Sequence, residues 1–211
     1  MASTFAVQSP ADAVNAALVR VGYRLRVGSL YDGSAAAKKA LDIYAQTRDE
    51  LLRQNDWAFA ERNVAATLLK SAPQTTNGQY GYIPPATWNG AVNPPLPWTF
   101  EYSWPPDCLK VRAVKPTPLL IPNFNPMPNL FAVVNDSYFA PPQRVIVSDV
   151  TNAQLVYTGQ VTDLTTWDSD SLEMLIDALG QRLAPSLNPE MLKLLVPEAA
   201  QSRATAEMEQ G

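Results

Sequence analysis

Proline is the residue that most restricts how this chain can fold, because it is concentrated in one zone. Fifteen of the 19 prolines fall between Pro73 and Pro142, and the flanks on either side are rich in alanine, leucine and valine. Proline is poorly tolerated inside helices and central strands. We therefore expect helical flanks around a middle region of strands and long loops.

The N-terminal flank carries two helix signals. Ser9 can cap a first helix that has Pro10 at its first position and ends at Gly22, and Ser34 can cap a second helix that runs to about Leu52. The apolar spacing predicts a buried face on each helix. These faces consist of Val14, Leu18 and Val21 in the first helix and Ala37, Leu41, Tyr44, Ala45 and Leu52 in the second.

The C-terminal flank has the clearest amphipathic pattern, with apolar residues at i, i+3, i+4, i+7 and i+11. They are Leu172, Leu175, Ile176, Leu179 and Leu183. One of Asp168, Ser169 and Asp170 is expected to cap this helix, and Pro185 to end it. A last helix is expected from residue 188, with a bend at Pro197.

The middle region contains one strong strand signal at residues 98–104. Its aromatic residues alternate with polar ones, which is the period of a half-buried strand. The aromatic residues are Trp98, Phe100, Tyr102 and Trp104, and the polar ones are Thr99, Glu101 and Ser103. We interpret the aromatic side chains as structural anchors in a core or an interface, a reading preferred to a sugar-stacking platform. Further strands are expected at residues 108–114, 130–134, 144–147 and 154–157.

These elements predict an α+β fold. Residues 1–72 and 160–211 are expected to form one helical bundle, and residues 73–159 a small antiparallel β-region with long Pro-rich loops. Trp57 and Phe59 follow the second helix directly. We expect them to anchor the exit from the bundle in the core. If the segment is extended, their alternate spacing puts both rings on one side, opposite Ala58 and Ala60.

Composition excludes several classes of function. Apolar residues make up 46% and charged residues 17%, as in folded globular chains, and a net charge of −4 argues against a nucleic-acid grip. No apolar run approaches about 18 residues, so no membrane span is expected. The chain has no histidine and one cysteine. These counts remove the commonest general base and most zinc sites, and we expect no enzyme activity, no cofactor and no metal.

Two sets of residues could still take part in catalysis or ligand binding. Asp163, Asp168 and Asp170 form an acidic cluster that could serve glycoside cleavage or calcium binding, but their position before a helix favours capping. Cys108 follows a turn and precedes a strand, with no histidine to activate it. A small buried apolar residue is the better interpretation of this cysteine.

Several segments, taken in order, resemble the phage head-to-tail adaptor or connector family, which includes the tail tubular A proteins of short-tailed phages. The series begins with a helical Arg48-Asp49 and continues with Trp57-x-Phe59-Ala60. It then reads Tyr-x-x-Pro-x-Asp-Cys-Leu at residues 102–109, and "LVYTGQVTDLTTWDSDSLEMLIDALGQRLAPSL" follows. Together the matching pieces cover roughly two-thirds of the chain, without the Pro-rich stretches at 73–97 and 116–142.

The resemblance implies a virion structural protein. Family members form a ring, usually of twelve subunits, beneath the portal vertex after DNA packaging, and extend the DNA channel. Their partners are the portal protein and the next tail protein (a nozzle or tail tube), and DNA passes through the ring without specific binding. The implied location is the head–tail junction of the virion, and the host cytoplasm during assembly.

The family's C-terminal segment reaches the portal, and this role falls here on residues 188–211. The portal-docking candidates in this segment are Met191, Leu192, Leu195, Val196 and Ala199. Two alternatives from other classes remain open. One is a phage-tail cell-wall glycan hydrolase that uses Asp163, Asp168, Asp170 or Glu101, and the other is a carbohydrate-binding module built on the strand at 98–104.

Overall fold

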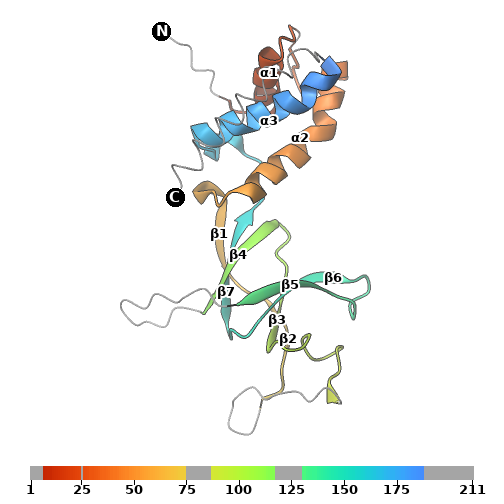
Figure 1. The fold of residues 1–211 in the computed structure, drawn as a ribbon, viewed down its shortest axis with the longest axis vertical. Helices are drawn as coiled ribbons and strands as arrows, with labels where there is room; N and C mark the ends of the chain where they lie inside the picture. Colours follow the sequence, from red (N-terminus) through yellow and green to blue (C-terminus); the bar gives the residue numbers. More distant parts are fainter. Residues whose placement is uncertain (1–6, 25, 75–86, 117–129, 188–211) are drawn as a thin grey trace, which may run out of the picture. The chain divides into compact units, whose positions relative to one another are not determined.

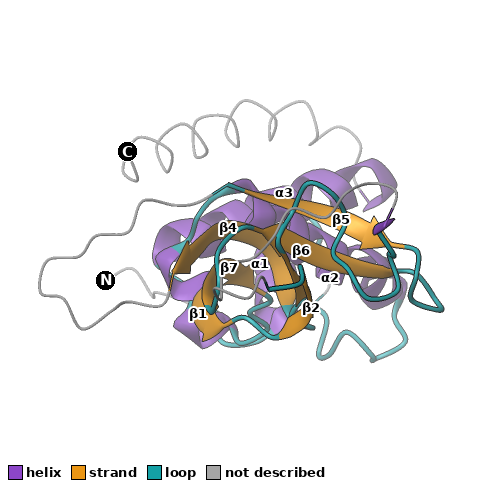
Figure 2. Ribbon diagram, turned by 90° about the horizontal axis from the view of Figure 1, so that it is seen from below, coloured by secondary structure: helices purple, strands orange, loops and turns teal. Residues whose placement is uncertain are grey.

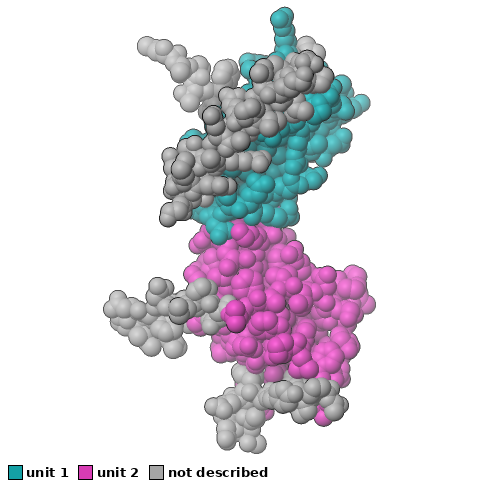
Figure 3. All heavy atoms as spheres, viewed as in Figure 1, with its two compact units in different colours: residues 1–59, 160–211 teal, residues 60–159 magenta. Residues whose placement is uncertain are grey.

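The computed structural model describes residues 7–24, 26–74, 87–116 and 130–187. These residues form three α-helices and two antiparallel sheets with seven strands, a mixed fold compatible with the expected α+β class. The chain divides into two compact units, which Figure 3 colours separately. We call Met1–Phe59 with Gln160–Gly211 the helical unit, and Ala60–Gly159 the β unit.

The helical unit contains α1 (Pro10–Arg20), α2 (Ala35–Gln54) and α3 (Ser169–Leu187) (Figure 1). Residues of α3 contact both α1 and α2. The predicted caps are confirmed: Ser9 accepts a hydrogen bond from the Asp12 amide in a capping box, and Ser34 accepts one from the Ala37 amide. The expected apolar face of α1 is buried, and all five apolar positions of α3 are buried or nearly so.

Two expectations for the helical unit are wrong. Leu41 and Ala45 are exposed, and the first half of α2 buries Ala36, Ala37, Ala40 and Tyr44 instead. Pro185 lies inside α3, which continues to Leu187. A proline this close to a helix end removes only one backbone hydrogen bond, so the final turn can still form.

The β unit contains two antiparallel sheets (Figure 2). The first has the order β1-β7-β4, from strands Glu61–Ala65, Ala153–Gly159 and Cys108–Pro116. The second has the order β2-β3-β6-β5, from strands Leu68–Ser71, Phe100–Ser103, Gln143–Ser148 and Phe131–Asp136. The chain passes from the first sheet to the second between β1 and β2, where the Ala66 amide still donates to the Ala153 carbonyl and the Thr67 carbonyl accepts from Ser103.

One hydrophobic core joins the two sheets of the β unit. It includes Phe100 and Tyr102 from β3, Ile146 from β6, and Val114 and Leu155 from the first sheet. Cys108 belongs to the same core and is 7% exposed, and burial raises the pKa of its thiol to about 12. It therefore lies as expected, as a small buried residue among apolar side chains.

The expected strands at 108–114, 130–134, 144–147 and 154–157 all form, with small shifts at their ends. The strand at 98–104 shrinks to Phe100–Ser103. Strands β1 and β2 were not expected, because "ERNVA" and "LLKS" are short and show no apolar alternation. β1 forms because it pairs with β7, and β2 because it pairs with β3. The local sequence of β1 and β2 gives no sign of this pairing. Among the described residues, no helix combines the length and the apolar character that crossing a membrane requires.

Candidate functional site

Three ionisable side chains meet inside the β unit. Lys70 on β2 lies opposite Glu101 on β3 in the strand register, and Asp136 ends β5 in the same sheet. Their side chains are 8%, 0% and 3% exposed, respectively. Charged residues are rarely buried to this degree unless they interact with one another, so we take these three as the candidate site and call them the Lys70 centre.

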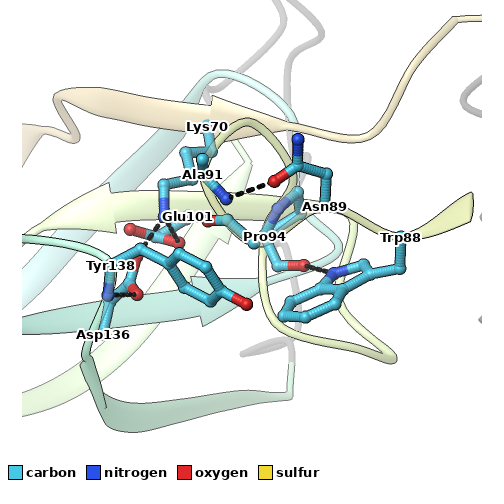
Figure 4. Close-up of polar contacts among 9 residues, drawn as sticks. Lys70, Trp88, Asn89, Ala91, Pro94, Glu101, Asp136 and Tyr138 are labelled. Carbon is cyan, nitrogen blue, oxygen red and sulfur yellow. Dashed lines mark hydrogen bonds and ion pairs between the residues drawn. The ribbon is translucent and has the colours of Figure 1, made fainter.

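Lys70 is the hub of the centre (Figure 4). Its Nζ forms an ion pair and a hydrogen bond with Oδ2 of Asp136, and it donates a second hydrogen bond of 2.8 Å to the carbonyl oxygen of Gly90. Nζ also lies 3.5 Å from Oε2 of Glu101. The ammonium therefore contacts two carboxyl groups and one backbone carbonyl.

Aromatic rings cover the tip of Lys70. Its Nζ lies 4.9 Å from the ring centroid of Phe139 and 5.7 Å from that of Tyr138. Tyr138 in turn meets Trp88 edge-on, with centroids 5.7 Å apart. Gly90 approaches the Tyr138 ring so closely that any side chain there would overlap it. The missing side chain of Gly90 thus allows its carbonyl oxygen to reach Lys70.

Asp136 is oriented from two sides. Its Oδ1 accepts a hydrogen bond of 2.8 Å from the backbone amide of Tyr138, while Oδ2 faces Lys70. Burial opposes ionisation of Asp136, but the hydrogen bonds from Lys70 and from the Tyr138 amide outweigh it and lower the pKa of this carboxyl below its ordinary value. Asp136 is consequently held as a carboxylate in a fixed orientation.

Glu101 is the unsatisfied member of the centre. Within the described part of the chain neither of its carboxyl oxygens has a hydrogen bond of good geometry. Burial raises the pKa of Glu101 to about 7, with the Lys70 ammonium opposing the rise and the Asp136 carboxylate adding to it. A glutamate in this state can take up or release a proton near neutral pH.

Sequence reasoning missed this centre. It placed Glu101 on the polar face of a half-buried strand, which is wrong because both faces of β3 are covered: Phe100, Glu101 and Tyr102 are all buried. Lys70 and Asp136 carried no signal, since β2 was not expected and Asp136 follows the end of an apolar strand. Only the register between β2 and β3 brings the lysine opposite the glutamate.

The proposed anchors at the exit from α2 lie together in the helical unit. Trp57 is 1% exposed and donates its indole N–H to the Leu51 carbonyl at 3.2 Å. Phe59 is half-buried, with its ring centroid 5.9 Å from that of Trp57 and 5.1 Å from that of Trp167. The condition of an extended segment is not met, because Ala58–Ala60 forms a short 3-10 helix, and Ala60 is itself buried.

The four aromatic residues at 98–104 have different surroundings. Phe100 and Tyr102 are buried in the core of the β unit, whereas Trp98 and Trp104 are half-buried. Trp104 carries the guanidinium of Arg144 on its ring at 3.8 Å and donates its N–H to the Cys108 carbonyl. The four rings therefore do not form one exposed platform.

The acidic cluster of the helical unit caps helices. Asp163 accepts from the Thr165 amide at the start of a 3-10 turn, and Asp168 accepts from the Ser171 amide at the start of α3. Asp170 lies in the first turn of α3. These contacts agree with the capping interpretation, and the residues that the structure describes contain no cluster of acidic or cysteine side chains suited to a metal ion.

A groove runs along the helical unit between the start of α1, the connector at residues 28–31 and α2. We call it the α2 groove. Its lining includes Leu30, Tyr31, Leu41, Tyr44, Ala45 and Arg48. Tyr31 is 82% exposed and Leu41 38% exposed, so apolar surface is left open there in the single chain. The portal-docking candidates between Met191 and Ala199 lie outside the described residues.

Comparison of the chain with known proteins adds no relative. No protein-family model matches it, and no curated protein matches it significantly.

Proposed function

We propose that this protein is a virion structural protein, a ring-forming adaptor that joins the portal to the tail and extends the DNA channel. The observation that carries the proposal is the ordered series of adaptor-like segments, whose residues occupy structural positions. Asp49 binds both Arg48 and the side chain of Gln160, and Trp57 and Phe59 pack beside Trp167. Residues 59 and 160 are where the chain leaves and re-enters the helical unit.

In this proposal the helices of both flanks build one bundle in the ring wall, and the β-region with its Pro-rich loops faces the tail. The α2 groove is the surface that receives the next copy of the chain. Its exposed Tyr31 and Leu41, with Ala45 beside them, supply apolar area, while Lys38 and Asp42 supply charges of both signs on the same helix. Residues 188–211 dock on the portal, and the acidic chain lets DNA slide past without tight phosphate contacts.

The structure offers no support to the two alternatives. Of the acids named for a glycan hydrolase, Asp163 and Asp168 cap helices and Asp170 lies in the first turn of α3. Glu101 is buried beside Lys70. A carbohydrate-binding face on β3 would need exposed rings, and Phe100 and Tyr102 are buried. We therefore retain the adaptor as the proposed function.

The groove can be tested by its effect on assembly. Leu41→Asp places a charge in the α2 groove without touching the core, so we expect the folded chain to bind portal protein of the same virus but fail to complete a ring. Leu130→Asp, at an 85% exposed position of the β unit, is the matched control and should assemble normally. Size measurement by light scattering distinguishes the two, and equal assembly by both variants would refute the role of the groove.

The portal contact is tested by removing residues 188–211. We expect the shortened chain to keep the circular dichroism of a folded protein and to lose binding to the portal. Normal docking by the shortened chain would assign the contact to another segment.

A further inference from the structure

The Lys70 centre holds an amine and a carboxyl group in contact, beside a second carboxyl group, that of Glu101, whose oxygens accept no hydrogen bond of good geometry within the described part of the chain. We propose that Lys70 and Asp136 become joined by an intramolecular isopeptide bond, with Glu101 as the catalytic residue that carries the protons. The bond would link β2 covalently to the end of β5, across the sheet that these two strands flank. It is independent of the adaptor proposal.

The geometry presents the two reacting groups to each other. Nζ of Lys70 already contacts Oδ2 of Asp136, and the side chains are 8% and 3% exposed. Proximity of this kind replaces an encounter in solution and so removes part of the barrier to forming an amide. The Phe139 and Tyr138 rings near Nζ limit the access of water, which would favour the reverse reaction.

The surroundings also fit the charge that develops. Attack of Nζ on Cγ of Asp136 places negative charge on Oδ1, and Oδ1 accepts a hydrogen bond from the Tyr138 amide at 2.8 Å. The carbonyl oxygen of Gly90, 2.8 Å from Nζ, orients the amine during attack. In the product the same two groups would pair with the new amide: Gly90 with its N–H and Tyr138 with its C=O.

Glu101 supplies the proton transfers. Asp136 rests as a carboxylate, so the reaction starts from the minor form in which a proton has passed from the Lys70 ammonium to the Asp136 carboxylate and both groups are neutral. The neutral amine then forms the C–N bond. Glu101, 3.5 Å from Nζ, accepts a proton from the nitrogen at one carboxyl oxygen and gives its own proton to Oδ2, which leaves as water. Glu101 ends protonated as it began, and the balance is one ammonium and one carboxylate converted to one amide and one water.

Glu101 is suited to this role because, among the described residues, its carboxyl oxygens are not held by hydrogen-bond donors. No hydrogen bond of good geometry holds either of its oxygens within the described part of the chain, so both remain available to exchange protons. Its pKa of about 7 means that the protonated and ionised forms both occur near neutral pH. A carboxyl group with only a structural role would instead be fixed by donors, as Asp136 is by Tyr138 and Lys70.

The test is the intact mass of the purified full-length protein, followed by peptide mapping. We expect the wild-type mass to lie below the sequence mass by one water molecule, with a cross-linked pair of peptides that contain Lys70 and Asp136. Glu101→Gln and Asp136→Ala should each keep the full mass of their own sequence. Lys110→Arg, at another lysine of the β unit, is the matched control and should lose the water as the wild type does.

Three results would overturn the proposal. A wild-type mass equal to that of the sequence after prolonged incubation at neutral pH rules out the bond, whatever the variants do. A water loss that maps to other peptides, including one that joins Lys70 to Glu101, rules out the Lys70–Asp136 assignment. Water loss in Glu101→Gln as complete as in the wild type removes Glu101 from the mechanism.

Discussion

The Lys70 centre of the β unit differs from the buried ion pairs of the helical unit in how far its members reach solvent. In the helical unit each buried charged group pairs with one that reaches solvent: Asp177 pairs with Arg20, whose side chain is 29% exposed, and Arg48 pairs with Asp49, which is 17% exposed. In the β unit, Lys70, Glu101 and Asp136 are all 8% exposed or less. Water therefore reaches one member of each of these helical pairs, whereas each charge of the Lys70 centre must be balanced by another buried group.

The largest expected loss of stability comes from removing the ammonium group of Lys70. Lys70→Met keeps most of the side-chain length but leaves the Asp136 carboxylate buried without a cation. Breaking a buried pair in this way costs about 3–5 kcal/mol of unfolding free energy. Urea unfolding of wild type and variant measures the difference, and a loss below about 1 kcal/mol, the value of a surface pair, would remove the contrast between the units.

The next effect is the pH dependence of the β unit. Glu101 has its pKa raised from 4.5 to about 7 by burial, so between these values the folded state binds more protons than the unfolded state. The stability contributed by protonated Glu101 is complete at the lower value and is lost as the pH rises to about 7, by roughly 3 kcal/mol at most. In molecules whose Lys70 and Asp136 are not joined, the lowered pKa of Asp136 acts in the opposite direction, and its contribution is lost as the pH falls.

Unfolding midpoints across this pH range test the sign. We expect the wild type to become less stable toward neutral pH and Glu101→Gln to lack that slope. Asp163→Asn serves as the control, because Asp163 lies at an exposed helix start and should leave the slope unchanged. An identical slope in Glu101→Gln would show that Glu101 is not the titrating group.

A smaller loss of stability is expected from displacing the Tyr138 ring that lies over Lys70. A side chain on Gly90 would overlap the Tyr138 ring, which is 56% exposed and can swing toward solvent. Gly90→Ala should therefore cost about 1–3 kcal/mol, through the loss of the Trp88 and Lys70 contacts of that ring. Gly28→Ala is the matched control, since nothing lies within 4 Å of a side chain built there. Equal melting temperatures of the two variants would mean that Tyr138 contributes nothing as a cover.

The smallest effect is expected in the helical unit. Arg182 forms an ion pair with Glu50, and the two side chains are 37% and 35% exposed. Arg182→Ala should reduce stability by about 0–1 kcal/mol, because an exposed pair gains little over water. A loss comparable with that of Lys70→Met would show that the two units do not differ as described.

The same contrast explains what the sequence could predict. Helices α1 to α3 follow from local signals, because Ser9 and Ser34 cap their own helices and the apolar spacing of α3 marks its buried face. The exposure of Leu41 and Ala45 was not predictable, because it depends on which other segments of the chain pack against each side of α2. The Lys70 centre joins residues 31 and 35 positions apart along the chain, in strands whose pairing no local pattern specifies. The Lys70 centre therefore depends on the register between strands that are distant in the sequence, and a single sequence does not show that register.

The adaptor proposal is tested most directly by electron microscopy of the full-length protein mixed with the portal protein of the same virus. We predict a second ring stacked beneath the portal ring, with no comparable ring in images of the protein alone. Images in which the portal stays bare while the protein remains a separate folded monomer would contradict the proposed function.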